Sequence, residues 1–308
     1  MTTMNQPPNK NMTELADRVR SLSEEMQPEP TGAASDLSSL PGIKAVLFDI
    51  YGTLFVSGSG DIGVQRKTQS GEALTDSLAA AGFEEVEPGA GPRGVQLLLG
   101  GIEQAHIKLR EQGLDVPEVE IRVIWREVLS ALREEGLVGG QLRAGMIDRL
   151  AIDYECRVNP TWPMPGLREL LQRLQDMSCR LGVVSNAQFY TPLLFVAHLG
   201  MTLEDLGFEP ALCVYSCDMW QAKPALRLFE KALEVLEQQH EIMPPQVLYV
   251  GNDMLNDMWP AATLGCRTAL FAGDRRSLRM REDDERCRDL RTDVVLTDLG
   301  QLIEVLGA

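Results

Sequence analysis

The chain has 308 residues, of which 44% are hydrophobic and 24% charged, a balance typical of a globular protein with a substantial core. Its formal net charge of −16 disfavours phosphate backbones and anionic lipid, so nucleic acid and membrane surfaces are poor candidate partners. No apolar run is long enough to span a bilayer and the first residues lack an apolar signal-peptide core, so we expect a cytoplasmic protein. The six scattered cysteines contain no C-x-x-C pair, which favours buried reduced thiols over disulfides or zinc ligands.

Residues 1–40 are polar and rich in Pro, Ser, Asn and Glu, so we expect a flexible N-terminal tail, in which residues 12–26 could form a short amphipathic helix. The apolar run Ala-Val-Leu-Phe at 45–48 predicts a buried parallel strand. Similar runs lie at 181–184, 212–215, 247–250, 268–271 and 294–296. Helical patterns separate several of them, and this alternation predicts an α/β fold with a doubly wound, Rossmann-like parallel sheet.

A long segment after the first strand interrupts the alternation. It contains helical patterns at 95–112, 121–135 and 141–154 and no convincing strand. We therefore expect an α-helical cap domain at 60–159, inserted into an α/β core domain formed by 41–59 and 160–308.

Polar side chains follow the predicted strands at the points where the strands end. Asp49 follows the first strand, Ser185 and Asn186 follow the second, and Lys223 precedes a helix. The acidic loop 251–257 follows the fourth strand. Because ligands of open α/β sheets bind at the carboxyl ends of the strands, we expect these groups to converge at one edge.

The four motifs, in this order, resemble those of the haloacid dehalogenase-like (HAD) superfamily over roughly residues 43–300, and the insert resembles that family's helical cap. The resemblance implies that Asp49 is a nucleophile that forms an aspartyl intermediate, which water then hydrolyses. It also implies that Ser185, Asn186 and Lys223 bind the anionic group of a small-molecule substrate.

The resemblance further implies a magnesium site. In the superfamily's phosphotransferases Mg²⁺ lies between the nucleophile, the backbone carbonyl two residues later and an acid of the fourth motif. Here these are Asp49, the carbonyl of Tyr51, and Asp253, with Asp257 as the second acid of the motif; such a ligand set suits Mg²⁺. Thr53 is expected to hold the nucleophile's loop in shape.

Two departures from the phosphatase pattern leave the chemistry open. Tyr51 replaces the second Asp that serves phosphatases as general acid and base, and 2-haloacid dehalogenases also have Tyr there, because a halide leaves without a proton. Those dehalogenases work without metal, however, and they carry a Tyr where this chain has Phe229 and a cap arginine that has no clear match here. Their fourth motif also lacks an acid at the position of the metal ligand. In this chain that position is occupied by Asn252 in one alignment with the family's motif and by Asp253 in another. We favour Asp253, because a carboxylate binds a hard cation better than an amide does.

The first hypothesis is therefore a Mg²⁺-dependent phosphohydrolase acting on a small phosphorylated metabolite. A carbon–halogen hydrolase is the second hypothesis, and a non-catalytic binding or regulatory protein on the same fold is the third. An arginine-rich loop at 275–281 follows a predicted strand. It is most simply a solvated turn, but its position at the sheet edge could also bring charge to a substrate.

Overall fold

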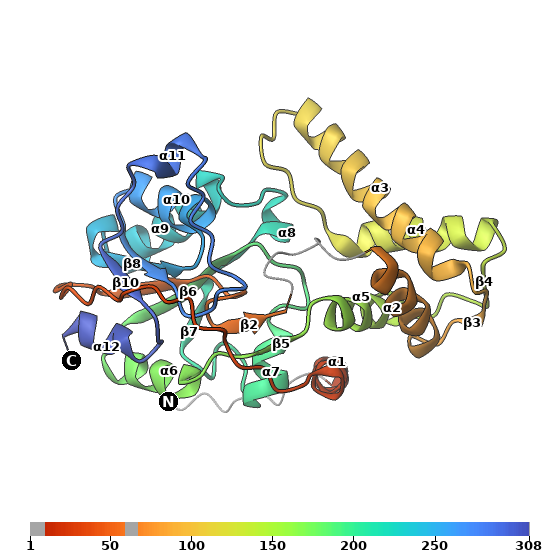
Figure 1. The fold of residues 1–308 in the computed structure, drawn as a ribbon, viewed down its shortest axis with the longest axis horizontal. Helices are drawn as coiled ribbons and strands as arrows, with labels where there is room; N and C mark the ends of the chain where they lie inside the picture. The colour runs from red at the N-terminus through yellow and green to blue at the C-terminus, as the bar shows by residue number, and fades with distance from the viewer. Residues whose placement is uncertain (1–9, 59–66, 308) are drawn as a thin grey trace.

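The structure is a computed structural model that describes residues 10–58 and 67–307. Its centre is a six-stranded sheet in the order β10-β9-β8-β1-β6-β7, with every neighbouring pair parallel (Figure 1). The strands are β1 (Ala45–Phe48), β6 (Arg180–Ser185), β7 (Phe208–Tyr215), β8 (Val247–Gly251), β9 (Arg267–Phe271) and β10 (Val294–Leu296). Each contains one of the predicted apolar runs, so the predicted fold class is confirmed.

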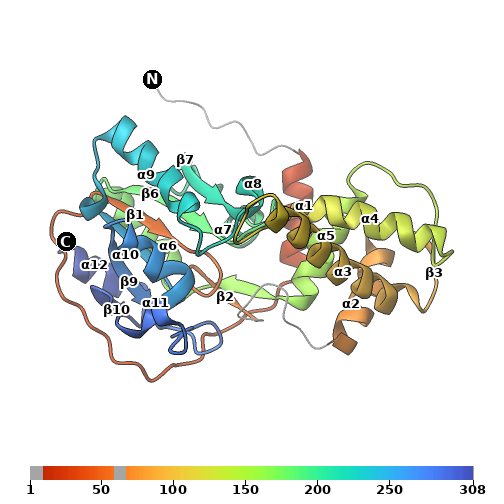
Figure 2. The ribbon, with the colours of Figure 1, turned by 90° about the horizontal axis from the view of Figure 1, so that it is seen from above.

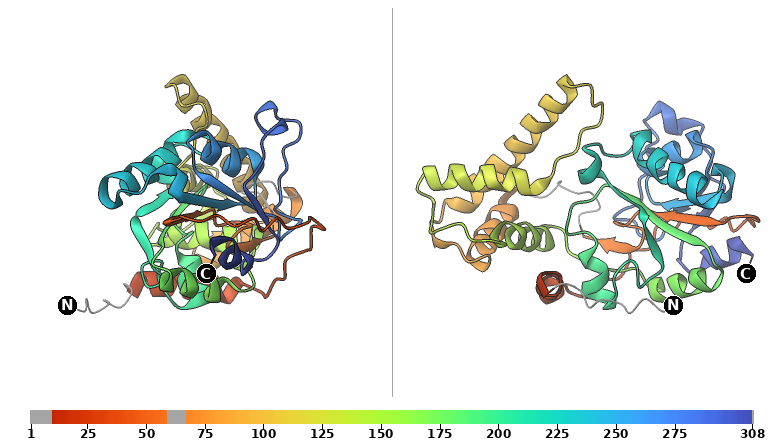
Figure 3. Two further views of the ribbon diagram at one scale, coloured as in Figure 1. Left: turned by 90° about the vertical axis from the view of Figure 1, so that its left-hand side faces the viewer. Right: turned by 180° about the vertical axis from the view of Figure 1, so that it is seen from behind.

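Helices cover both faces of this sheet (Figures 1 and 3). On β1, Val46 and Phe48 pack with α6, α7 and α12, whereas Ala45 and Leu47 pack with α9 and α10, because successive side chains of a strand point to opposite faces. The helices of this domain are α6 (Leu167–Asp176), α7 (Leu193–Leu199), α8 (Ser216–Met219), α9 (Leu226–His240), α10 (Trp259–Thr263), α11 (Glu285–Arg288) and α12 (Gln301–Leu306). Of the helices in the described residues, none has the length and apolarity needed to cross a membrane.

The segment between β1 and β6 forms a second, largely helical body at the other end of the molecule (Figures 1 and 2). Its helices are α2 (Lys67–Ala80), α3 (Ala90–Glu111), α4 (Ile121–Glu134) and α5 (Met146–Val158). One short antiparallel pair joins two of its turns, β3 (Glu84–Val86) with β4 (Val138–Gly139). No strand was predicted in this segment. A second pair, β2 (Phe55–Ser57) with β5 (Thr161–Pro163), lies where the chain leaves and re-enters the core. The expected domain boundary at 59–60 lies outside the described residues.

The described part of the expected tail is ordered against the rest of the protein. Residues 10–22 form α1 (Lys10–Leu22), whose Leu15, Ala16 and Val19 are buried. This apolar stripe packs against both α5 of the cap and α7 of the core. This helix overlaps the stretch 12–26 for which the sequence allowed a short amphipathic helix, and its packing surface could not be known from the sequence.

Two arginines fasten α1 to these helices. Arg18 forms an ion pair with the buried carboxylate of Asp153 on α5. Arg20 donates to the carbonyl oxygen of Ala197 on α7, at 2.7 Å. The N-terminal helix therefore bridges the cap and the core.

Candidate active site at the carboxyl edge of the sheet

Asp49 is the first residue beyond β1. Its backbone N–H donates to the carbonyl of Val250 on the neighbouring strand, at 2.9 Å, so its position is fixed by the sheet. The chain then turns at Gly52, whose φ of +81° is in the left-handed region. A Cβ atom at this position would also collide with Asn252 and Ser277, so the turn requires glycine.

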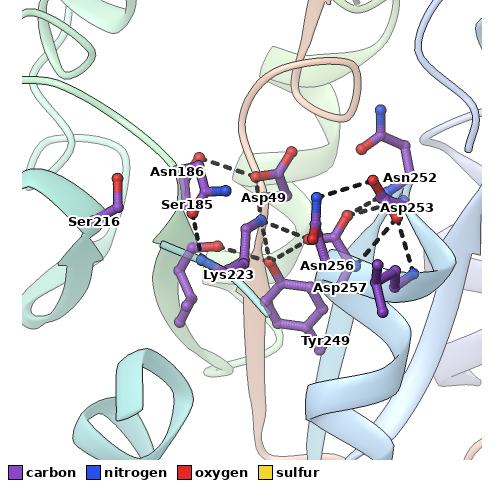
Figure 4. Close-up of polar contacts among 12 residues, drawn as sticks. Asp49, Ser185, Asn186, Ser216, Lys223, Tyr249, Asn252, Asp253, Asn256 and Asp257 are labelled. Carbon is purple, nitrogen blue, oxygen red and sulfur yellow. Dashed lines mark hydrogen bonds and ion pairs between the residues drawn. The ribbon is translucent and has the colours of Figure 1, made fainter. Parts of the chain in front are cut away.

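Lys223 is the centre of a buried polar network at this edge (Figure 4). Its Nζ donates to Asp49 Oδ1 at 2.7 Å, to Asp257 Oδ1 at 2.5 Å and to the hydroxyl of Tyr249 at 3.1 Å. Burial alone would lower the pKa of Lys223, but the carboxylates of Asp257 and Asp49 outweigh it and raise that pKa. The ammonium is therefore charged and held between two acids.

Ser185 and Asn186, both expected to bind substrate, contact Asp49 and Lys223. The hydroxyl of Ser185 is fully buried and donates to Asp49 Oδ1 at 2.9 Å. Asn186 Oδ1 accepts from the backbone N–H of Lys223 at 2.7 Å. Oδ1 of Asp49 thus accepts from two donors, Ser185 and Lys223. Thr53 is also fully buried; its backbone N–H donates to the carbonyl of Ile50 at 3.2 Å, and its hydroxyl has no hydrogen-bond partner among the described residues.

Asp257 is tied on both of its oxygens. Oδ1 accepts from Lys223, and Oδ2 accepts from the backbone N–H groups of Asn252 and Asp253, each at 2.9 Å. Burial raises the pKa of Asp257, and Lys223 acts in the opposite direction. Its contacts make it an anchor for the lysine and for the loop after β8.

Asp253 has a different set of partners from the one expected of a magnesium ligand. Its carboxylate caps the π-helix η2 (Met254–Met258) by accepting from the N–H groups of Leu255 and Asn256, at 2.9 and 3.1 Å. The guanidinium of Arg281 also donates to both of its oxygens, with the shortest contact at 2.6 Å. A positive charge already stands beside this carboxylate. Within the described residues, no three His, Cys, Asp or Glu side chains are grouped to hold a metal.

The contacts and the raised pKa of Tyr51 disfavour a role as general acid or base at neutral pH. Its hydroxyl shares a hydrogen bond of 3.0 Å with the hydroxyl of Thr191. Burial raises the pKa of Tyr51 well above its usual value, and the nearby carboxylate of Glu155 adds to this effect. The phenol therefore stays protonated and engaged with the core.

Asp49 and Lys223 line a cavity of about 460 Å³ between the core and the cap. The loop after β8 and the loop after β9 contribute Asn252, Ser277 and Arg279 to the same floor. The cap covers it with mostly apolar side chains from α3, α4 and α5, namely Val95, Leu98, Leu99, Ile102, Ile121, Trp125, Ala151 and Val158. A ligand would thus meet charge at one end and apolar surface over much of the rest.

Several residues of this site had no signal in the sequence. Tyr249 looked like one apolar residue of a buried strand, yet its hydroxyl reaches Lys223 and also donates to the carbonyl of Val184 at 2.7 Å. Glu118 and Glu155 line the cavity from the insert, where no motif marks them. The arginine-rich loop 275–281 was the exception, because its position after a predicted strand placed it at this edge of the sheet. Its Arg281 forms an ion pair with Asp253.

The haloacid dehalogenase-like hydrolase family matches residues 43–265, well over half of the chain. Together with the fold, this match shows that the chain belongs to that family of hydrolases. No curated protein matches the chain.

Solved structures of similar fold include dehalogenases and phosphatases. A 2-haloacid dehalogenase from Pseudomonas syringae pv. Tomato DC3000 is 20% identical, with a TM-score of 0.55 over 85% of this chain and 97% of that one. A HAD phosphatase from Thermococcus onnurineus is 18% identical, with a TM-score of 0.46 over 86% and 98% of the two chains. The likeness to the 2-haloacid dehalogenase supports the fold alone and leaves the reaction to be argued from the residues.

Proposed function

We propose that this chain is a hydrolase that forms a covalent ester on Asp49 without a resident Mg²⁺ and releases a leaving group that needs no proton. Hydrolysis of a carbon–halogen bond in a small organic molecule is the reaction that these residues support best. The observation that carries the proposal is the pairing of Asp253 with Arg281.

A magnesium ion at this edge would be held by Asp49 and, where a second carboxylate is open to it, by an acid of the loop after β8. Asp257 is held by Lys223 and two backbone N–H groups, and Asp253 by Arg281 and the first turn of η2. The cation would stand next to the guanidinium of Arg281, whose like charge repels it. As they are arranged, these residues do not fit the metal.

The same arrangement supports displacement at carbon. The carboxylate of Asp49 attacks the carbon that bears the halogen; a C–O bond forms as the C–X bond breaks, and the halide departs with the electron pair. Water then attacks the carboxyl carbon of the ester, which releases an alcohol and a proton and restores Asp49. Lys223 and Ser185 orient the nucleophile through Oδ1 in both steps.

Tyr51 agrees with this chemistry. A phosphate ester releases an alkoxide that requires a general acid, and help of that kind is worth on the order of 10² to 10⁴ in rate. Tyr51 is half-buried, its hydroxyl shares a hydrogen bond with that of Thr191, and its pKa is raised well above the ordinary value. A halide leaves as a stable anion, so the replacement of the second Asp costs that reaction nothing.

The Mg²⁺-dependent phosphohydrolase predicted from the sequence is the second candidate. It would require Arg281 to release Asp253, or the Asn252 register to apply. The side-chain Nδ2 of Asn252 donates to the carbonyl oxygen of Ser277 at 2.9 Å, so its Oδ1 would be the atom that coordinates a cation.

A substrate screen in two metal conditions tests the proposal. Short-chain 2-haloacids, other small organic halides and aryl phosphates of graded leaving-group pKa are assayed with EDTA and with Mg²⁺, and Asp49→Asn serves as the control. We expect halide release that EDTA does not reduce. Phosphate release that depends on Mg²⁺, with no halide release, would overturn the proposal in favour of the second candidate. If only aryl phosphates react, a steep dependence on leaving-group pKa would still support the interpretation of Tyr51.

A further inference from the structure

The cavity walls above Asp49 carry two carboxylates, Glu155 on α5 and Glu118 on the connection between α3 and α4. Neither residue takes part in the chemistry at Asp49. They will be called the wall carboxylates.

The contacts of Glu155 are all with neutral groups. The side-chain amide of Asn159 donates to Oε1 at 3.1 Å, and the hydroxyl of Tyr190 donates to the same carboxylate. Burial raises the pKa of Glu155 above its usual value, and these two hydrogen bonds only partly offset it. Among residues 10–58 and 67–307, no basic side chain pairs with a charge at this position.

Glu118 shows the same pattern on another wall. Its Oε1 accepts from the backbone N–H of Val119 at 2.8 Å, and its Oε2 accepts from the hydroxyl of Ser216 at 2.8 Å. Burial again raises the pKa, and both hydrogen bonds lower it. Throughout the described residues, neither wall carboxylate forms an ion pair with a basic side chain.

Aromatic rings line the same walls. Tyr51, Trp125, Tyr154 and Tyr190 border the cavity, and Trp125 meets Tyr154 edge to face with ring centroids 5.4 Å apart. Aromatic faces attract organic cations, most strongly where water is excluded. Glu118 and Glu155 are half-buried, and carboxylates partly withdrawn from water without a cation are costly, a cost that a ligand cation would lower.

We propose that this cavity contains a recognition site for an organic ammonium group, held by Glu155 against the rings of Trp125, Tyr154 and Tyr190, with Glu118 on another wall of the same cavity adding negative charge. The substrate class is thus a small molecule with an electrophilic centre at one end, placed at Asp49, and an alkylammonium at the other. This deepens the proposed function, on which it rests for the reactive end. The overall charge of −16 would also draw such a cation toward the protein.

Two probes of nearly equal shape test the site. Choline carries a quaternary ammonium, and 3,3-dimethylbutan-1-ol replaces its nitrogen with carbon. Each is titrated calorimetrically into the full-length protein at matched ionic strength. We expect choline to bind at least about tenfold more tightly than the neutral alcohol, the range given by a desolvated cation–π contact with carboxylate support.

Variants locate the site. Glu155→Gln keeps the size of the side chain and should weaken choline about tenfold while leaving the neutral alcohol unchanged; Glu118→Gln should weaken it in the same direction. Glu134→Gln, on the exposed surface of the cap, is the matched control and should change neither. Equal affinities of wild-type protein for the two probes would overturn the proposal, as would choline binding that survives both wall substitutions.

Neither titration requires turnover. A protein that binds choline as expected and releases no halide would therefore count against the proposed reaction alone. Halide release from small haloacids without any preference for choline would count against the ammonium site alone.

Discussion

The carboxylates at the core end of the cavity and those on its walls differ in whether a basic side chain pairs with them. At the core end, Asp49 and Asp257 share the ammonium of Lys223, and Asp253 has the guanidinium of Arg281. On the walls, Glu118 and Glu155 accept hydrogen bonds from neutral donors. The carboxylates at the core end are thus paired with basic side chains of the protein. Those on the walls have no such partner among the described residues, and a ligand could supply the positive charge.

Removal of the nucleophile should have the largest effect. Asp49→Asn is expected to lower turnover of any hydrolysed substrate by on the order of 10⁴ or more, because the ester can no longer form. The amide keeps the shape of the side chain, so the unfolding midpoint should move little. Steady-state kinetics on protein checked by mass spectrometry for deamidation measures this, and wild-type turnover in the intact variant would refute the nucleophile.

Lys223→Met breaks the charge balance at the core end. It leaves two buried acids without their cation, and loss of one partner from a buried ion pair typically costs about 3–5 kcal/mol. Denaturant unfolding of this variant should show a loss of that order. Lys231→Met on the exposed face of α9 is the control. If both variants unfold at the same denaturant concentration, the pairing of Lys223 contributes no stability.

Arg281→Gln makes Asp253 resemble the wall carboxylates by removing its cation. We expect Mg²⁺ to bind this variant at least about tenfold more tightly than wild type, since the guanidinium no longer repels it. Arg291→Gln, exposed on the loop before β10, serves as control. Calorimetric titration decides the point. Wild-type protein that already binds Mg²⁺ equally well, and loses it in Asp253→Asn, would instead favour the register chosen from the sequence.

Glu118→Gln should have the smallest effect, on the pH dependence of stability. Burial raises the folded-state pKa of Glu118 above its ordinary value of 4.5, so the folded state holds the proton more tightly than the unfolded state. The associated stability is present below that ordinary value and is lost as pH rises through the raised pKa. The variant should lose less stability over that rise, by a few tenths to about 1 kcal/mol. Thermal unfolding across this pH range, beside the exposed control Glu103→Gln, measures it; parallel curves for wild type and Glu118→Gln would show that this carboxyl is not perturbed.

The sequence alone predicted the sheet, the helical insert and the positions of Asp49, Ser185 and Lys223. Short apolar runs between helical patterns have few other ways to bury themselves, and parallel strands bring their carboxyl ends to one edge. Those three side chains could therefore be placed together from their order along the chain. The structure brings them within hydrogen-bond distance.

What the side chains do there was decided by contacts between segments far apart in the chain. Asp253 was predicted as a metal ligand from its position in the loop after β8, and its pairing with Arg281 from the loop after β9 is visible only in the structure. The structure shows that the apolar stripe of α1 packs against α5 and α7, a pairing that the sequence does not reveal. Glu155 belongs to no sequence motif, and only its place on α5 brings it to the cavity. Local patterns report which face of an element is apolar, but the charge beside a given carboxylate depends on which distant segment packs against it, and only the tertiary structure determines that.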